Sequence, residues 1–204
     1  MNESWIRTLE AHVPIHGTVV VLHALSPEHI DPLAAIGLDE ELWQWTVSRV
    51  SDAGELAAYV RTALRERQAG ASFPFAIVER TSGRVVGCTR YGNMDAGNRR
   101  LEIGWTWVGR EFQRSPVNTE TKYLLLRTAF ETLECIRVEF KTDVLNERSR
   151  TALERIGARE EGILRKHMVT ATGRIRDTVY YSILDSEWQD VGAQLLNRLE
   201  RASA

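Results

Sequence analysis

The chain has 204 residues, of which 43% are hydrophobic and 26% charged, and its formal net charge is -2 at pH 7. This length is enough for one sizeable hydrophobic core, and the near-neutral charge argues against a nucleic-acid-binding protein, whose affinity depends on clustered Lys and Arg. No basic flank with an apolar run opens the sequence, and no segment approaches the roughly 18 uninterrupted apolar residues of a membrane span, so we expect neither secretion nor membrane insertion.

The first predicted elements are one strand and two helices. Residues 18–25, TVVVLHAL, are β-branched and apolar enough for a strand. A helix follows, with Ser26 as its N-cap and Pro27 in its first turn. Residues 51–70 place apolar side chains at helical spacing and end in Gly70, which predicts a second helix.

Three antiparallel strands are predicted next. Residues 73–91 contain two apolar runs joined by a Ser-Gly turn, which is typical of a hairpin. Residues 100–108, RLEIGWTWV, alternate along a third strand. The alternation places Glu102, Gly104 and Thr106 on one face and the apolar residues Leu101, Ile103, Trp105 and Trp107 on the other.

The second half of the chain alternates helices with strands. From Asn118 the apolar spacing is helical, and residues 136–144 predict a strand. A helix over 146–156 is closed by Gly157, and strands follow around 163–169 and 175–184, with a turn near Gly173. A final helix begins at about Ser186.

This order of elements predicts a single α/β (α+β) domain over residues 1–204. The core covers about 17–188 and the C-terminal helix about 186–200. We expect a mixed, mostly antiparallel sheet of about seven strands with helices on both faces.

The loop at residues 112–118 is a candidate anion site. Asn118 is a good N-cap for the helix that follows, and Arg114, Ser115 and Thr119 add hydrogen-bond donors around the same helix start. An ordinary capped helix would show the same residues. The local sequence leaves both interpretations open.

The cysteines and histidines predict no metal site. Cys88 and Cys135 lie far apart in the sequence, so neither a disulfide framework nor a paired-cysteine metal site is expected. His12 and His16 have the spacing of a helical zinc pair, but Pro14 disfavours a helix there. A reducing cytoplasm fits this composition best.

Several of these segments together resemble a known family. The strand LEIGWTWV, the loop GREFQRSPVNTE, the helix TKYLLLRTAFETL, the strand RVEFKTDVLNERS and the helix ending ALERIGAREEGILRKH look like the core of the GNAT-type N-acetyltransferase superfamily. The branch that is most similar contains the ribosomal-protein N-terminal alanine and serine acetyltransferases. The resemblance spans roughly residues 17–188.

The resemblance implies acetyl-CoA as the co-substrate. In the family, the fourth and fifth strands splay apart, pantetheine lies in the gap, and the diphosphate sits on amides at the following helix start. Gln113 matches the first position of the family's loop, whereas Pro116 replaces a glycine and has no amide hydrogen to donate. The implied cofactor-binding residues are Trp107, Val108, Gln113, Arg114, Ser115, Val117, Asn118, Thr119 and Asn146.

The resemblance also implies catalytic residues. Glu102 corresponds to a glutamate that orders a water to deprotonate the amine, although a solvated strand glutamate would look the same. Asn146 and Ser149 match the family's Asn-x-x-Ser, with Ser149 near the thioester sulfur, although Asn146 is equally a good N-cap. His167 and Asp177 are weaker candidates for the base.

Trp43 and Trp45 lie between the first two predicted helices, in the region that lines the acceptor site in the family. The alternative interpretation is that both tryptophans pack in the core.

The activity implied by the resemblance is acetyl transfer from acetyl-CoA to a primary amine, on a protein N-terminus or a small molecule, by direct attack in a ternary complex. Two alternatives stay open: a noncatalytic acyl-CoA-binding protein, and an enzyme that uses a longer acyl-CoA such as succinyl-CoA. Relatives often form homodimers, so a homodimer is among the expected assemblies.

Overall fold

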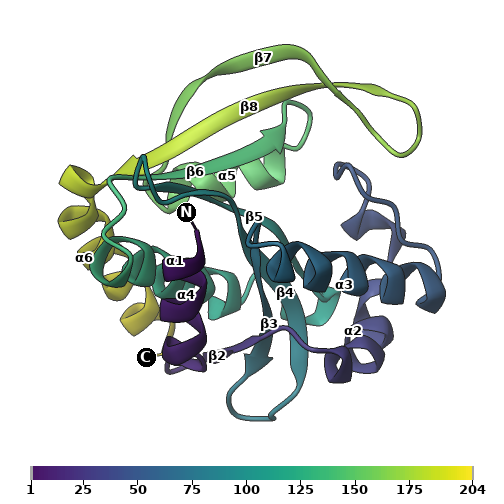
Figure 1. Cartoon of the computed structure of the whole chain (residues 1–204), viewed down its shortest axis with the longest axis horizontal. Coiled ribbons are helices and arrows are strands. Elements are labelled where there is room, and N and C mark those ends of the chain that lie inside the picture. Colours follow the sequence, from purple (N-terminus) through teal and green to yellow (C-terminus); the bar gives the residue numbers. More distant parts are fainter. Residues whose placement is uncertain (1, 204) are drawn as a thin grey trace.

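In the computed structural model, which describes residues 2–203, eight strands form one sheet in the order β1-β2-β3-β4-β5-β6-β8-β7 (Figure 1). Only the β5–β6 pair among them is parallel. The strands are β1 (Ile15–His16), β2 (Val20–Ala24), β3 (Phe73–Glu79), β4 (Val85–Asp95), β5 (Arg100–Val108), β6 (Arg137–Asp143), β7 (Arg159–Val169) and β8 (Ile175–Leu184). The helices are α1 (Glu3–His12), α2 (Ile30–Gly37), α3 (Ala53–Gln68), α4 (Pro116–Arg127), α5 (Glu147–Arg155) and α6 (Asp185–Ser203).

Helices cover both faces of the sheet, as predicted. The larger core cluster joins α1, α4, α5 and α6 to the sheet, and the smaller one joins α2 and α3 to its other face. In Figure 1, α1, α4 and α6 lie on the opposite side of the central strands from α2 and α3. The mixed, mostly antiparallel sheet is therefore confirmed, with eight strands rather than about seven. Within residues 2–203, no helix is long and apolar enough to cross a membrane.

Several element ends follow local signals that the sequence carries. Ser26 is the N-cap of a short 3-10 helix that leads into α2; its N–H donates to the His29 Nδ1 at 3.0 Å, and Pro27 occupies the first position of that helix. Gly157 ends α5 with φ of 90°, and Gly173 turns the β7–β8 hairpin with φ of 80°, a left-handed conformation that glycine adopts without strain.

Helix α1 was not predicted, and tertiary contacts explain why it forms. Trp5 and Leu9 lie one helical turn apart and are both buried in the larger core cluster. The Asn2 amide donates to the carbonyl oxygens of Gly70 at 3.2 Å and Met94 at 2.7 Å. A helix this short is marginal alone, so docking onto the sheet supplies its stability.

A β-bulge in β5 corrects the predicted alternation. Cys88 pairs with Trp107 and Arg90 with Gly104, so Thr89 on β4 stands opposite both Trp105 and Thr106. Trp105 has φ of 50°, a left-handed conformation that a tryptophan in the sequence does not predict. The extra residue reverses the two-residue period. As a result, Trp107 packs with the α2–α3 cluster instead of sharing a face with Leu101 and Ile103.

Glu120 on α4 ties the helix to the β1–β2 turn. Its buried carboxylate accepts hydrogen bonds from the main-chain N–H groups of Thr18, Val19 and Val20 at 2.6–2.8 Å, and from the Thr18 hydroxyl at 2.6 Å. A Cβ atom at Gly17 would clash with this carboxylate, so the turn requires glycine. The contact fixes the position of α4 against β2.

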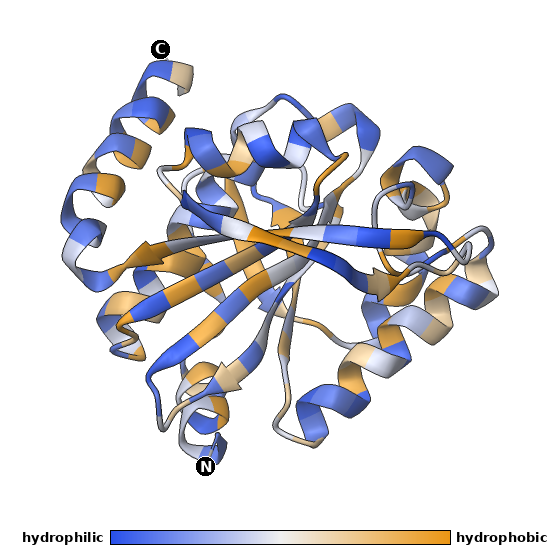
Figure 2. Cartoon of the chain, turned by 90° about the horizontal axis from the view of Figure 1, so that it is seen from above, coloured by the Kyte–Doolittle hydropathy of each residue, from blue (hydrophilic) through white to orange (hydrophobic). Residues whose placement is uncertain are grey.

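The β7–β8 hairpin arches away from the rest of the sheet (Figure 1). Hydrophilic and hydrophobic residues alternate along its strands (Figure 2). β7 is exposed along nearly its whole length, and its pairing with β8 shifts register between Leu164 and Met168. β8 is therefore the strand through which the hairpin joins the rest of the sheet, by pairing with β6.

Candidate active site

The β5–β6 contact is a short seam that opens into a gap. Only Arg100, Leu101 and Glu102 of β5 pair with β6, opposite Arg137, Val138 and Glu139. Beyond these three pairs, β5 and β6 are still neighbours in the sheet but no longer pair with each other. The predicted splay between the fourth and fifth strands corresponds to this β5–β6 gap, because the two-residue β1 was not counted in the prediction.

Helix α4 begins beside this gap. Ser115 is its N-cap, donating to the Phe112 carbonyl at 2.6 Å and accepting from the Val117 N–H at 3.3 Å. The prediction that Asn118 caps the helix is wrong, and Pro116 at the first helical position was the signal for Ser115. Because Pro116 has no N–H and that of Val117 is bonded, the Asn118 N–H is the amide of the first turn that the helix and its cap leave free.

Two polar residues link the loop to α5 across the mouth of the gap. The side chain of Gln113 donates to the Val108 carbonyl at 3.2 Å and accepts a hydrogen bond from Arg148. Arg114 is exposed and has φ of 61°. Arg148, which the sequence did not single out, thus places a second guanidinium near the start of α4.

Glu102 stands at the inner end of the gap, within a charged cluster. Its carboxylate is only 5% exposed; Oε2 accepts from Asn93 at 2.5 Å and from the Lys141 Nζ at 2.7 Å. Glu102 is therefore not the solvated strand residue considered as the alternative. Burial lowers the pKa of Lys141, but the charge and hydrogen bond of Glu102, together with the charges of Tyr180 and Glu139, raise it overall.

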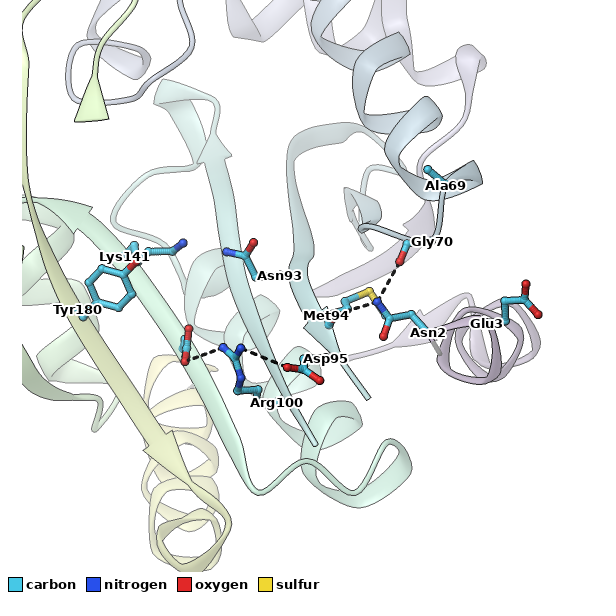
Figure 3. Close-up of a pocket in the computed structure, with 11 residues that line it drawn as sticks. Asn2, Glu3, Ala69, Gly70, Asn93, Met94, Asp95, Arg100, Lys141 and Tyr180 are labelled. Atoms are coloured by element: carbon cyan, nitrogen blue, oxygen red, sulfur yellow. Dashed lines mark hydrogen bonds and ion pairs between the residues drawn. The ribbon is translucent and has the colours of Figure 1, made fainter. Parts of the chain in front are cut away.

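A cavity of about 840 Å³ opens next to this cluster (Figure 3). Lys141 and Tyr180 line one side of it, and the Lys141 ammonium lies 5.4 Å from the centre of the Tyr180 ring. The ring of His167 meets the same tyrosine edge to face at 5.9 Å. The predicted candidate His167 therefore contacts Tyr180 of the cavity lining, whereas the carboxylate of Asp177 accepts from the Lys166 N–H on the hairpin. Further lining residues are Asn93, Arg100 and Glu139.

Arg176 is buried near the same acidic groups without a full set of partners. It is 7% exposed, and its Nε has no hydrogen-bond partner among residues 2–203. Burial lowers its pKa, which the charges of Asp143 and Glu102 partly oppose. Arg176 and Tyr180 are four residues apart on β8, so one face of this strand carries both a guanidinium and a phenol.

Asn146 and Ser149 lie at the start of α5, which follows β6 on the other side of the gap. Asn146 Oδ1 accepts the N–H of Ser149 at 3.0 Å, so the amide is an N-cap, as one interpretation predicted. Its Nδ2 group is not used in this cap. Both side chains are half-buried, which keeps them within reach of a molecule in the gap.

The two tryptophans have different surroundings. Trp43 is buried, packs against Trp107, and donates from Nε1 to the Gly37 carbonyl at 2.7 Å. Trp45 is half-buried, and the guanidinium of Arg174 from the β7–β8 hairpin lies over its ring. Trp43 is therefore a core residue, although it also lines a second cavity of about 570 Å³ beside the tip of the β7–β8 hairpin.

One residue of the gap was missed entirely from the sequence. Lys122 on α4 is 6% exposed, and its Nζ donates to Thr106 Oγ1 at 2.8 Å. Thr106 in turn shares a hydrogen bond with Thr89 at 2.7 Å. Since lysines are rarely buried, no sequence signal marked this one.

Neither cysteine is placed for nucleophilic chemistry. Cys88 and Cys135 are both buried, and burial raises the pKa of each thiol to about 12. Among residues 2–203, no group of three His, Cys, Asp or Glu side chains is arranged to hold a metal ion.

The sequence matches one family model over most of its length. The model of the acetyltransferase (GNAT) domain matches residues 20–159. YdaF of Bacillus subtilis, named as a candidate ribosomal N-acetyltransferase, is 40% identical over 107 residues, which are 52% of this chain and 57% of YdaF. That similarity therefore covers little more than half of the relative's length.

Solved structures match the fold more completely. A GCN5-related N-acetyltransferase from Brucella melitensis has a TM-score of 0.84 and 32% identity, over 91% of this chain and 84% of that one. A candidate acetyltransferase from T. thermophilus has a TM-score of 0.83 and 36% identity, over 91% of this chain and 96% of that one.

Proposed function

Because the chain belongs to the acetyltransferase (GNAT) family and is an acyltransferase, we propose that it moves an acetyl group from acetyl-CoA to a primary amine. The observation that carries this proposal is the β5–β6 gap, which begins after three residue pairs and opens beside the start of α4. An extended thioester can lie between strands that no longer pair, with its phosphates at a helix start.

In this proposal the diphosphate lies against Asn118, Thr119, Arg114 and the side chains joined to Gln113. The amides past Pro116 and the dipole of α4 favour an anion there. Arg148, which already contacts Gln113, adds a further cation at the same mouth. These donors compensate for the amide hydrogen that Pro116 lacks.

The acceptor amine enters from the opposite side, through the cavity that Lys141 and Tyr180 line. An ammonium must lose a proton before it attacks the thioester, and Glu102 at the inner end of the gap takes that proton, directly or through one water. The C–N bond then forms as the C–S bond breaks. The raised pKa of both buried thiols supports direct attack over a cysteine intermediate.

For the acceptor, a protein N-terminus is the first class to test, because the YdaF relative is named for ribosomal acetylation. Small amines form the second class. Incubation with acetyl-CoA and a panel of N-terminal peptides, amino acids and polyamines, followed by mass spectrometry of product and free CoA, tests both. Tight CoA binding with no product from any amine would instead support a noncatalytic acyl-CoA-binding protein.

Substitution of Arg114 by glutamate is expected to weaken CoA binding by about tenfold or more, because the new carboxylate opposes the diphosphate. Isothermal titration calorimetry with CoA measures the effect. Arg65→Glu, on the solvent side of α3, is the matched control and should leave the affinity unchanged. Equal affinities of wild type and Arg114→Glu would place Arg114 outside the site.

Asn146→Asp separates the two roles of Asn146. Aspartate caps a helix as well as asparagine does, so the melting temperature should change little. A carboxylate has no hydrogen to give, so CoA affinity should fall if Nδ2 donates to the co-substrate. We expect stable folding with weaker binding; unchanged binding would leave Asn146 as a cap alone.

A further inference from the structure

The ammonium group of Lys122 lies between β5 and β6, where the two strands have separated. Its Nζ is 2.8 Å from Thr106 Oγ1 on β5 and 5.5 Å from the centre of the Phe140 ring on β6. Both contacts come after the last residue pair of the seam, Glu102 with Glu139. Lys122 lies six residues into α4, about 9 Å along the axis from Pro116.

This lysine has no ion-pair partner among residues 2–203. The 14 ion pairs include Lys141 but not Lys122. The single acceptor, Thr106 Oγ1, meets one of the three hydrogens of an ammonium group. A buried cation in this setting is costly, whereas methionine would fill the same volume without that cost.

We propose that Lys122 donates a proton to the CoA thiolate as it leaves, a role that rests on the proposed acetyl transfer. The location supports this, because α4 carries the diphosphate site at its start and Lys122 inside the gap where the thioester would extend. Lys122 is not among the residues that line the cavity beside Lys141 and Tyr180, through which the acceptor is proposed to enter.

Lys122 loses one proton in this step and regains one, so it ends in the protonation state in which it began. The amine nitrogen bonds to the acetyl carbon, the C–S bond breaks, and the ammonium of Lys122 gives its proton to sulfur. Glu102 releases the proton of the incoming ammonium to water. The nitrogen of the new amide still carries one surplus proton, which then passes through Glu102 or water and restores Lys122 to its cation. Amine and acetyl-CoA thus give amide and CoA, with no further reactant.

The protonation equilibrium of Lys122 suits this role. Burial lowers its pKa to about 7, and the negative charge of Glu102 opposes the shift. Glu102 on β5 is the titratable group whose charge reaches it; β4 and β6 present the uncharged Thr89 and Phe140. A cation with this pKa is more acidic than a thiol, so proton transfer to the thiolate is downhill.

An NMR titration tests the protonation state without any turnover. The chain has only three lysines, Lys122, Lys141 and Lys166, so ¹³C-labelled lysine gives three side-chain signals that single substitutions assign. We expect the Lys122 signal to titrate near pH 7, whereas the raised pKa of Lys141 leaves its signal unchanged over that range. A Lys122 signal that titrates near 10 would overturn the proposal.

Kinetics of Lys122→Met then test the catalytic role. We expect kcat to fall about 10²-fold, with CoA affinity unchanged. The fall of wild-type kcat/KM above pH 7, where the cation is lost, should be absent from the variant. Arg127→Met, further along α4 and half-buried, is the matched control and should retain wild-type kinetics.

Stability separates this role from a structural one. In the native state Lys122 loses its proton near pH 7, but in the unfolded state only near its ordinary pKa, so wild type gains stability as pH rises from 7 to 10. Lys122→Met should melt at the same or a higher temperature than wild type, most clearly below pH 7. A variant that melts lower and loses activity only in proportion to unfolding would overturn the proposal.

Two further results keep the proposals distinct. If wild type binds CoA but acetylates no amine, the proposed function fails even where the titration of Lys122 is as expected. If wild type is active and Lys122→Met retains its rate and its pH profile, only the Lys122 role fails. Stoichiometric acetylation of Lys122 itself, detected by peptide mass spectrometry, would make it an acyl acceptor and overturn proton donation.

Discussion

Glu120→Ala is expected to lower the free energy of unfolding by about 3–5 kcal/mol, because three main-chain N–H groups lose their acceptor at a partly buried turn. Urea unfolding followed by circular dichroism measures the change. Glu120→Gln keeps one acceptor oxygen and should cost less. Glu131→Ala is the matched control: that carboxylate, further along the same helical segment, accepts one hydrogen bond from Trp188 at an exposed site.

The control should cost less than about 1 kcal/mol, since one exposed hydrogen bond contributes little. If Glu120→Ala unfolds at nearly the same urea concentration as wild type, water replaces the carboxylate in the β1–β2 turn. In that case Glu120 would not be what fixes α4 against β2.

Glu102→Gln is expected to lower kcat by about 10²-fold or more, because glutamine keeps the shape of the side chain but cannot accept the amine proton. CoA affinity should change little, since Glu102 lies at the inner end of the gap. The measurement is the pH dependence of kcat with the best acceptor from the amine panel.

Loss of Glu102 also leaves Lys141 without its partner, so stability needs a separate control. Glu66→Gln breaks a comparable ion pair, with the buried Arg90 on β4, away from the cavity lining. We expect both variants to be destabilised, but only Glu102→Gln to lose turnover. Full activity of Glu102→Gln across the pH range would assign its carboxylate to structure alone.

The order of strands and helices was readable from the sequence, because patterns and end signals agreed. Gly157 and Gly173 stand where the backbone needs positive φ, and Ser26 caps the short helix before α2. Helix α1 was missed because its stability comes from distant partners of Asn2, Trp5 and Leu9.

The candidate site was only partly predictable. The loop before α4 carries its own signal in Gln113 and Pro116, and the choice of cap between Ser115 and Asn118 went wrong only by ignoring proline at the first helical position. Trp105 adopts positive φ with no glycine to mark it, and Lys122 is buried only because two strands separate beside it. Such features depend on tertiary geometry that no local window contains.

The strand edges of this sheet bear on how the protein avoids aggregation. Its outer edges are β1, which has two residues, and β7, where the register shift and the positive φ of Gly162 and Lys166 spoil the flat template that another strand needs. The β5–β6 gap is a third, internal pair of edges. It lies between β4 and β8 in the same sheet, so it is not an outer edge to which a strand from another molecule can be added. The unpaired parts of β5 and β6 therefore lie inside the sheet, where a narrow ligand fits between them but a further strand does not extend the sheet.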